Sequence, residues 1–426
     1  MNTPASFNEL ERRVEDLTEI LKIARSLTAE KNLDELLHLI IESATRVMHA
    51  DRSSLFLVDE EKKELYSKIA QGSKEIRFSI GAGIAGVVAQ TKTIINISDA
   101  YQDSRFNQEF DRKSGYCTRT ILCSPLVTHE GKVVGVLQVL NKAQGTFSAY
   151  DEYLLQALAN HAAIALDNAQ LIGHYLEKQR LQQSLSIARE IQQSFFPQIP
   201  PQFESYDIYG TSLSCDETGG DYFDFIPVTE HQIAIAVGDV SGHGLGSALV
   251  MVAARASLIG FLDLQLDISQ ILTRMNRQLT RDNSSEKFMT LLVGILDMKQ
   301  HTFQYTSAGH DAPLFFQKTY HIFQELDSTG VPLGMLENEE FPKSDIYSII
   351  PGDILLFATD GVWETMDAKN ETFGKDRIMD LIRNECHLSA KDLVETILKE
   401  LKRFSENQIQ RDDITLIILK RIPLKP

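Results

Sequence analysis

Four aspartates in this sequence stand where apolar, strand-forming segments begin or end. Asp239 follows the apolar run Gln232–Val237 inside the glycine-rich segment GDVSGHG, after which apolar residues recur at helical spacing. Asp360 follows a second apolar run in LLFATDG, and Asp221 and Asp412 each precede a predicted strand. Hard divalent cations prefer carboxylate and carbonyl oxygens, so these acids suit a Mg²⁺ or Mn²⁺ site if the fold gathers them. Each motif alone is equally typical of a turn with a solvated acid.

Five segments in this order resemble the motifs of the PPM metal-dependent serine/threonine phosphatases, in the bacterial branch that includes SpoIIE and RsbU. They are GGDYFDF, GDVSGHGLGSALVM, YTSAGHDAPLFF, PGDILLFATDGVWE and RDDITLIIL. The resemblance covers about residues 190–422 and implies two Mn²⁺ or Mg²⁺ ions between two β-sheets. Two such ions can activate a water and neutralise a phosphoryl group.

The same resemblance assigns the metal ligands, whose carboxylates would also be the catalytic residues. They are Asp221, Asp239, the carbonyl of Val240, Asp360 and Asp412, with Asp239 bridging both ions. Asp413 is placed beside the ligands. Eukaryotic relatives hold phosphate with an arginine upstream of the first aspartate, and the segment Cys215–Thr218 offers none. The residue that contacts phosphate therefore stays unassigned.

The N-terminal part shows an α-β-α order with the segments GIAG, RTILCSPL and GVLQVLNK, and it resembles a GAF domain over about residues 30–172. The spacing of Asn141, Lys142, Phe147, Asp151 and Glu152 resembles the NK-F-xxx-DE signature of GAF domains that bind cyclic nucleotides. By this resemblance, Lys142 and Asp151 form a partly buried ion pair that supports the pocket.

The resemblance also implies a pocket for a cyclic nucleotide. Its expected contacts are Arg52, Ser54, Ile84, Ala85, Asp111, Ser114, Thr118 and Gln138. Ile84 and Ala85 stand at a predicted helix start, where backbone N–H groups favour an anionic phosphate. Arg52 with Ser54 favours cyclic AMP over cyclic GMP, while Ala70 and Gln71 depart from residues that stack on or read the purine in relatives. The alternative is a GAF domain without ligand that serves dimerisation only.

A helical linker is predicted between the two domains. Its apolar residues recur at helical spacing, at Leu176, Leu181, Leu185, Ala188, Ile191 and Phe195. Such a stripe can pack as a coiled coil in a homodimer, and Pro197 ends the helix. The segment Glu190–Pro197 resembles a movable element that completes the metal site in regulated bacterial phosphatases; a passive spacer is the alternative.

The predicted fold class is α+β with several domains. An N-terminal helix occupies residues 1–29, and a GAF domain with a central antiparallel sheet and flanking helices occupies residues 30–172. A helical coiled-coil linker covers residues 173–200, and a phosphatase αββα sandwich covers residues 201–426.

Composition narrows the function classes further. A net charge of −17 argues against binding to nucleic acid or anionic membranes. We expect no membrane-spanning segment, because no apolar run approaches about 18 residues. The first residues lack a signal-peptide pattern, and the four cysteines show no CxxC spacing, so we predict a cytoplasmic protein with reduced thiols.

These features together predict a homodimeric, cytoplasmic serine/threonine phosphatase regulated by a cyclic nucleotide. By resemblance, its substrate is a phosphorylated anti-sigma-factor antagonist of the STAS type. A non-catalytic scaffold that binds a partner is the competing class. A cyclic-nucleotide phosphodiesterase is disfavoured, because no HD-type cluster of His and Asp is apparent. His243 and His310 are expected to order turns.

Overall fold

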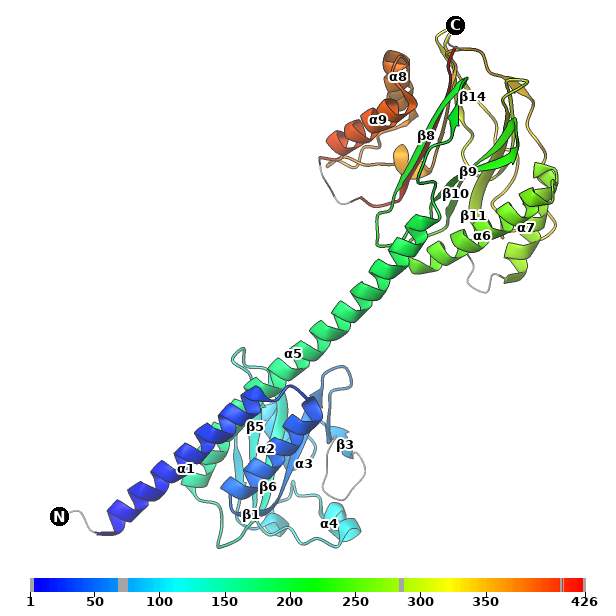
Figure 1. The fold of residues 1–426 in the computed structure, drawn as a ribbon. Helices are drawn as coiled ribbons and strands as arrows, with labels where there is room; N and C mark the ends of the chain where they lie inside the picture. The colour runs from blue at the N-terminus through cyan, green and yellow to red at the C-terminus, as the bar shows by residue number, and fades with distance from the viewer. Residues whose placement is uncertain (1–3, 68–75, 283–286, 407, 409, 424–426) are drawn as a thin grey trace. The chain divides into compact units, whose positions relative to one another are not determined.

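The computed structural model describes all residues except 1–3, 68–75, 283–286, 407, 409 and 424–426. The described residues form two compact units, residues 1–180 and 181–426, which are drawn in Figure 1. Each unit has its own β-structure and its own hydrophobic core.

The first unit is built on a six-stranded antiparallel sheet with the strand order β3-β2-β1-β6-β5-β4. The strands are β1 (Ala50–Asp59), β2 (Glu64–Ser67), β3 (Ile76–Ser79), β4 (Ile95–Ile97), β5 (Ile121–Val127) and β6 (Val133–Lys142). The helices are α1 (Pro4–Ala29), α2 (Leu33–Val47), α3 (Gly83–Thr91), α4 (Gln108–Ser114) and the beginning of α5 (Ala149–Ser194), with a 3₁₀ turn at Ala100–Gln102.

Successive side chains of a strand point to opposite faces of the sheet, and both faces of this sheet are apolar. Leu55 and Leu57 point to one face, where they join residues of α1, α2 and α5 in a common core. Phe56 points to the other face and packs with Val88 of α3 and Val136 of β6. The antiparallel sheet with flanking helices expected for residues 30–172 is confirmed.

Helix α5 differs from the sequence-based division into a domain helix and a linker. It runs without interruption from Ala149 to Ser194 over 46 residues. The predicted helix of the GAF domain and the predicted linker helix are therefore one helix.

Ala70 and Gln71, which bear on the choice of purine, lie outside the described residues.

The second unit contains two antiparallel sheets. The first has the order β15-β12-β11-β10-β9 and the second the order β14-β13-β16-β17-β8-β7. The strands are β7 (Gln202–Phe203), β8 (Tyr206–Leu213), β9 (Tyr222–Thr229), β10 (Gln232–Val240), β11 (Met289–Asp297), β12 (Thr302–Ala308), β13 (Leu314–Gln317), β14 (Ile322–Glu325), β15 (Tyr347–Ser348), β16 (Ile354–Ala358) and β17 (Ile414–Arg421). The helices are α6 (Leu245–Asp263), α7 (Ile268–Asp282), α8 (Lys375–Glu385) and α9 (Ala390–Phe404), with a 3₁₀ turn, η2, at Asp360–Val362.

These elements form four layers. Helices α6 and α7 pack on the outer face of the first sheet, and α8 and α9 pack on the outer face of the second (Figure 1). Between the sheets lies a core of large side chains that includes Phe303, Tyr305 and Phe357. Leu355 points into this core while its neighbour Leu356 points toward α8 and α9. The predicted αββα sandwich is confirmed.

The composition of one helix bears on the expectation that the sequence holds no membrane-spanning segment. Helix α6 is long and apolar enough to cross a membrane by length and composition, although the sequence was expected to hold no such segment. In the structure, Met251, Ala254, Leu258 and Leu262 of this helix are buried in the core shared with α7 and the first sheet. Packing inside the domain therefore explains these four apolar residues, while Leu245 and Leu249 of the same helix are exposed.

Candidate functional site

The four predicted ligand acids lie at strand ends of both sheets in the second unit. Asp221 directly precedes β9 and Asp239 is the penultimate residue of β10, both in the five-stranded sheet. Asp360 begins η2 after β16, and Asp412 stands two residues before β17, both in the six-stranded sheet. Residues nearly two hundred positions apart thus meet where the two sheets face each other.

A glycine marks the centre of this cluster. A Cβ atom on Gly220 would lie 2.6 Å from the carbonyl oxygen of Val240, 3.1 Å from Oδ1 of Asp239 and 3.3 Å from the carbonyl oxygen of Gly242. The backbone of Gly220 therefore borders a small space lined by oxygen atoms, which any larger residue would fill. We call this space, together with the four aspartates predicted to bind metal, the metal centre.

Burial and mutual repulsion raise the pKa of all four acids. Burial, together with the charges of Asp360 and Asp412, raises the pKa of Asp239 to about 7. Burial and the neighbouring Asp239 raise the pKa of Asp221 well above its usual value, although Thr359 Oγ1 donates to Asp221 Oδ2 at 2.8 Å. Burial also raises the pKa of Asp360 and of Asp412, and each of these is further raised by a neighbouring carboxylate. Such a cluster is unfavourable without positive charge.

The donor set fits hard divalent cations. It consists of carboxylate and carbonyl oxygens, the atoms that Mg²⁺ and Mn²⁺ prefer. Among the described residues, no three carboxylate, imidazole or thiol groups lie close enough together to hold one ion. The acids are thus gathered, but their side chains are not drawn into a closed coordination sphere. Repulsion between uncompensated carboxylates favours this open arrangement.

Two buried side chains fix the turn that carries Asp221. Asp413 accepts hydrogen bonds from the backbone N–H of Cys215 at 2.8 Å and of Gly220 at 2.7 Å. Gln192, near the end of α5, donates from Nε2 to the carbonyl oxygen of Gly219 at 2.7 Å. In return, the N–H of Gly219 donates to Oε1 of Gln192 at 3.2 Å. The turn before the first ligand is therefore held from both sides.

Some of these contacts were not predicted. A role for Thr359 beside the metal ligands could have been predicted, because it directly precedes Asp360. A role for Lys287 could not have been predicted from the sequence, because it lies far along the chain from the residues that it contacts. Its Nζ donates to the carbonyl oxygen of Ser241 and to Oγ of Ser247, both at 2.9 Å. The ammonium group thereby fastens the glycine-rich turn that follows Asp239.

The two histidines singled out in the sequence lie near the metal centre in different settings. His243 is exposed, and its Nδ1 lies 2.5 Å from Oδ2 of Asp216. His310 is buried, and its Nδ1 lies 2.9 Å from Oγ1 of Thr290, the residue paired with Asp239 between β10 and β11. Burial lowers the pKa of His310 to about 4, so it is neutral at neutral pH. His310 therefore supports the strand behind Asp239.

In the first unit, several predicted pocket residues share one face of the sheet. Ser54 of β1 lies directly opposite Gln138 of β6. Each lies two residues along its strand from a residue that packs toward α3, Phe56 in β1 and Val136 in β6, so both lie on the α3 face of the sheet. Ile84 and Ala85 are in the first turn of α3, whose N-cap residue Ala82 makes no side-chain hydrogen bond. Helix N–H groups that could bind an anion thus begin above this face.

Two of the remaining predicted pocket residues, Asp111 and Thr118, are hydrogen-bonded to each other. Asp111 accepts hydrogen bonds from the N–H of Thr118 at 2.7 Å, from its Oγ1 at 2.8 Å and from the hydroxyl of Tyr101 at 3.0 Å. The guanidinium of Arg52 lies 4.2 Å from the ring centre of Tyr116. Ser114 ends α4, and its side chain is outside the described set. Asp111 and Thr118 are therefore engaged with each other.

The predicted ion pair of the signature motif is present. Nζ of Lys142 lies 2.7 Å from Oδ1 of Asp151, and both side chains are largely buried. Burial would raise the pKa of Asp151, but hydrogen bonds from Lys142 and Ser148 hold it below its usual value. Lys142 also donates to the carbonyl oxygen of Met48 at 2.9 Å. The pair therefore joins β6 to α2 and α5.

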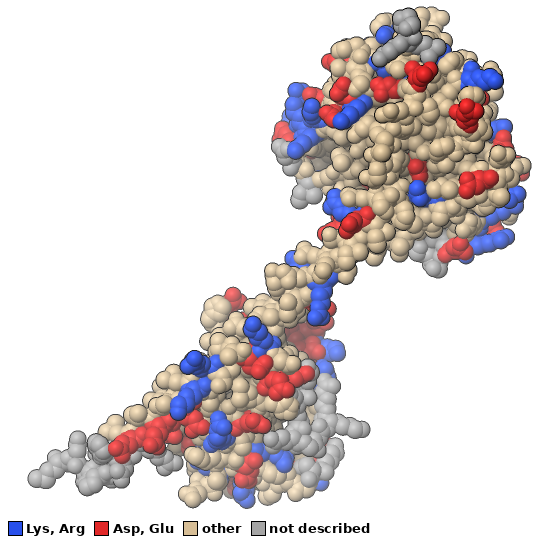
Figure 2. All heavy atoms as spheres, viewed as in Figure 1, with Lys and Arg blue, Asp and Glu red and all other residues tan. Residues whose placement is uncertain are grey.

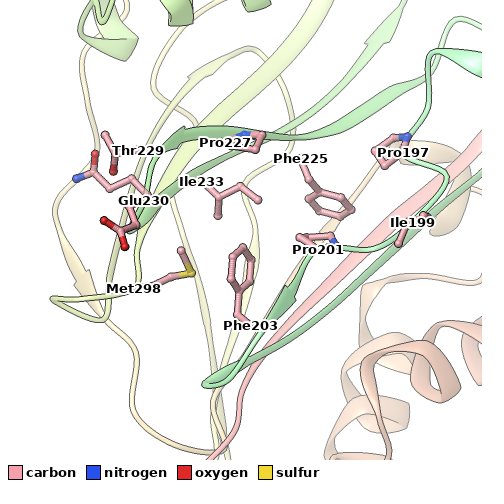
Figure 3. Close-up of a pocket in the computed structure, with 11 residues that line it drawn as sticks. Pro197, Ile199, Pro201, Phe203, Phe225, Pro227, Thr229, Glu230, Ile233 and Met298 are labelled. Carbon is pink, nitrogen blue, oxygen red and sulfur yellow. The ribbon is translucent and has the colours of Figure 1, made fainter.

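An apolar pocket of about 390 Å³ lies at the opposite end of β9 and β10 (Figure 3). Figure 3 shows Phe203, Phe225 and Met298 around it. Ile233, also in its lining, is six residues before Asp239 on β10, a distance of roughly 20 Å along a strand. The pocket therefore does not belong to the metal centre.

Comparisons with known proteins agree with this division. The family model described as Stage II sporulation protein E (SpoIIE) matches residues 229–422, and the GAF domain model matches residues 32–166. The SiaA-PP2C domain of Pseudomonas aeruginosa has a similar fold, with a TM-score of 0.51 and 21% identity over 58% of this chain and 98% of that domain.

Curated relatives match a smaller share. A probable 3′,5′-cyclic phosphodiesterase of Caenorhabditis elegans is 37% identical over 40% of this chain and 25% of its own length. A cGMP-specific 3′,5′-cyclic phosphodiesterase of Drosophila melanogaster is 35% identical over 45% of this chain and 19% of its own length. This chain thus spans a quarter or less of these two relatives.

The class of each domain follows from the fold, the site and these matches. The C-terminal domain is a PPM serine/threonine phosphatase domain, and the N-terminal domain is a GAF domain. Within the PPM class, the C-terminal domain matches the SpoIIE family model over residues 229–422.

Proposed function

We propose that this chain is a Mn²⁺- or Mg²⁺-dependent protein serine/threonine phosphatase whose GAF domain binds a 3′,5′-cyclic nucleotide. The observation that carries the phosphatase assignment is the metal centre itself. Asp239 borders the oxygen-lined space beside Gly220, and burial together with the charges of Asp360 and Asp412 from the other sheet raises its pKa. Such a cluster is stabilised by bound cations.

The residues have distinct roles in this proposal. Asp221, Asp239, Asp360, Asp412 and the Val240 carbonyl would hold two ions, which when bound supply an activated water and neutralise phosphoryl oxygens. The Thr359 hydroxyl orients Asp221 by donating to its Oδ2. Asp413 and Gln192 fix the turn that delivers Gly220 and Asp221 to the centre.

The test of the phosphatase function uses the purified full chain. We expect release of p-nitrophenol from p-nitrophenyl phosphate with Mn²⁺ or Mg²⁺, and none after chelation with EDTA. Phosphate should also be released from a phosphoserine peptide. If neither substrate is hydrolysed with either metal, the chain is a non-catalytic scaffold that binds a partner.

The proposed physiological substrate is a phosphorylated anti-sigma-factor antagonist of the STAS type, in a cytoplasmic setting. This assignment rests on the match of the C-terminal domain to the SpoIIE family model. It predicts a higher kcat/KM on a phosphorylated STAS domain than on the same phosphopeptide excised from it.

We predict that a cyclic nucleotide changes the phosphatase rate by at least about fivefold, the lower range of typical allosteric coupling. Ser54 and Gln138 on the sheet and the uncapped start of α3 support a ligand with a polar base and an anionic phosphate. Cyclic AMP is favoured by Arg52 with Ser54, and the cGMP-specific relatives make cyclic GMP the second candidate.

The measurement is calorimetric titration followed by rate assays, with 5′-AMP as the control for the cyclic phosphate. Replacing both Ser54 and Gln138 with alanine should weaken binding of the preferred nucleotide roughly tenfold, which corresponds to about 1.4 kcal/mol. Dissociation constants weaker than millimolar for both nucleotides would leave the GAF domain as a dimerisation element.

We also predict that α5 mediates homodimerisation. Leu181 is 61% exposed although it continues the apolar stripe with Leu185 and Ala188. Leu181→Asp with Leu185→Asp would bury unpaired carboxylates in a coiled-coil seam, so the dimer should dissociate. Light scattering measures the mass. The control is Gln183→Asp with Ser186→Asp, which places the same charges on the opposite side of the helix. A monomeric wild type, or equal masses for both variants, would contradict the coiled coil.

A further inference from the structure

A groove of about 680 Å³ lies in the second unit beside the metal centre. Its lining includes Asp412 and Gly361, a metal-ligand candidate and the residue that follows Asp360. The other walls come from Leu213 at the end of β8, from Met366 after η2, and from one side of α9. We call it the α9 groove. A phosphorylated residue whose phosphate reached the metal centre would have its neighbouring residues within reach of this groove.

The groove combines apolar contact area with positive charge. Leu213 is 42% exposed, and Leu398 and Ile414 contribute further apolar surface. Lys399, Lys402 and Arg411 also line it.

These cations are available to a partner. In the part of the chain that the structure describes, none of Lys399, Lys402 and Arg411 forms an ion pair, and Arg411 donates only to Sδ of Met366, at 3.4 Å. Lys391 and Arg403 on the same helix, by contrast, pair with Glu395 and Glu400. Figure 2 shows Lys and Arg side chains interspersed with Asp and Glu side chains over the α8 and α9 face. The lining holds these three cations and two carboxylates, Glu364 and Asp412, so positive charge is in excess there although the chain has a net charge of −17.

We propose that the α9 groove binds the polypeptide that flanks the phosphorylated residue of the substrate, and that it selects flanking segments rich in acidic and apolar side chains. The inference rests on the proposed phosphatase function and adds a determinant of substrate choice. Charge complementarity supports an acidic partner. The apolar residues Leu213, Leu398 and Ile414 favour a peptide over a small acidic molecule, because a small molecule would not cover them. Attraction between surface charges is screened by salt, so the selectivity must weaken as ionic strength rises.

The test compares two synthetic phosphoserine peptides on the full chain with Mn²⁺. One carries Glu and Leu around the phosphoserine, and the other carries Lys and Leu at the same positions. We expect kcat/KM for the acidic peptide to exceed that for the basic peptide by roughly tenfold, mainly through KM, a factor equivalent to about 1.4 kcal/mol. In Lys399→Glu with Lys402→Glu this ratio should fall to about one or below.

The matched control is Lys391→Glu with Arg403→Glu, which makes the same charge change on α9 outside the groove. It should keep the wild-type ratio, and 0.5 M NaCl should reduce that ratio. Equal ratios in the two double variants, or no peptide preference in the wild type, would overturn the groove assignment.

A second readout separates the groove from the chemistry. Fluorescence anisotropy with the unphosphorylated peptides should show tighter binding of the acidic peptide to the wild type and loss of that preference in Lys399→Glu with Lys402→Glu. Selective binding without hydrolysis of any phosphate ester would retain the groove and reject the phosphatase function. Hydrolysis of p-nitrophenyl phosphate without selective binding would do the reverse.

Discussion

Asp239→Asn is expected to abolish metal-dependent phosphatase activity, a loss of at least about 1,000-fold, while the protein remains folded. Asp239 lies at the end of β10 and is influenced by the charges of Asp360, Asp412 and Asp413, so it is the acid most surrounded by the others. Loss of its charge weakens the site for every cation at once. Asp221→Asn, Asp360→Asn and Asp412→Asn should each cost at least about 100-fold, the usual range for one electrostatic group in a transition state.

The rates are measured on p-nitrophenyl phosphate over a range of Mn²⁺ concentrations, and circular dichroism checks the fold. Asp263→Asn is the control, because this exposed residue ends α6 away from the cluster. Retained Mn²⁺-dependent turnover in Asp239→Asn would remove Asp239 from the metal centre.

The same variant should have the opposite effect on metal-free stability. The folded-state pKa of Asp239, about 7, lies above the usual aspartate value of 3.8, so folding favours the protonated acid. Metal-free wild type should therefore lose stability as pH rises from about 4 through 7, because the unfolded chain releases this proton first. Asp239→Asn lacks this loss, and its melting temperature at pH 7.5 in EDTA should exceed that of the wild type. Adding Mn²⁺ should raise the melting temperature of the wild type only.

Gln192→Leu is expected to reduce phosphatase activity by about 100-fold, although the residue lies on a helix and contacts no predicted metal ligand. Its buried amide makes two hydrogen bonds to the backbone of Gly219. Leucine fills a similar volume but leaves both backbone groups unpaired, which costs about 1–3 kcal/mol for each buried group. The turn should shift to recover hydrogen bonds, and a displacement of about 1 Å at a catalytic centre can cost 100-fold.

Activity and apparent Mn²⁺ affinity are measured together, because a positioning residue should act through the metal site. We expect a weaker apparent affinity and partial recovery at high Mn²⁺. Gln193→Leu serves as the control, since Gln193 is the exposed neighbour on the same helix. If both variants behave like the wild type, the contact between α5 and the Gly219 turn has no part in the activity, and the passive-spacer interpretation of this segment stands.

Local patterns were sufficient to predict much of this fold. The continuous apolar run that contains Leu355 and Leu356 indicates a strand buried on both faces, and the glycine-rich segment after β10 indicates a turn into a helix. The acids at strand ends were visible for the same reason.

Contacts between distant segments could not be predicted in this way. The pair Gln192 and Gly219 is separated by 27 positions, and Lys287 reaches the Ser241 carbonyl across 46 positions. Nothing in either local sequence distinguishes these side chains from solvated ones. The engagement of Asp111 with Thr118 shows the same limit, because a polar residue expected to face a ligand instead completes the hydrogen bonds of a neighbour. The α9 groove likewise arises from three segments that carry no common motif.

The position of β17 has a consequence for the making of this protein on the ribosome. This strand is the last along the chain among the described strands, yet it lies between β16 and β8 in the interior of its sheet. Asp412 and Asp413 immediately precede it. A nascent chain that has emerged only as far as α9 therefore lacks one ligand, the anchor of the Gly220 turn and the strand that joins two halves of a sheet. On the proposed ligand set, such a chain cannot complete the metal centre, so we expect the phosphatase to stay inactive until residues 412–421 have left the ribosome and inserted.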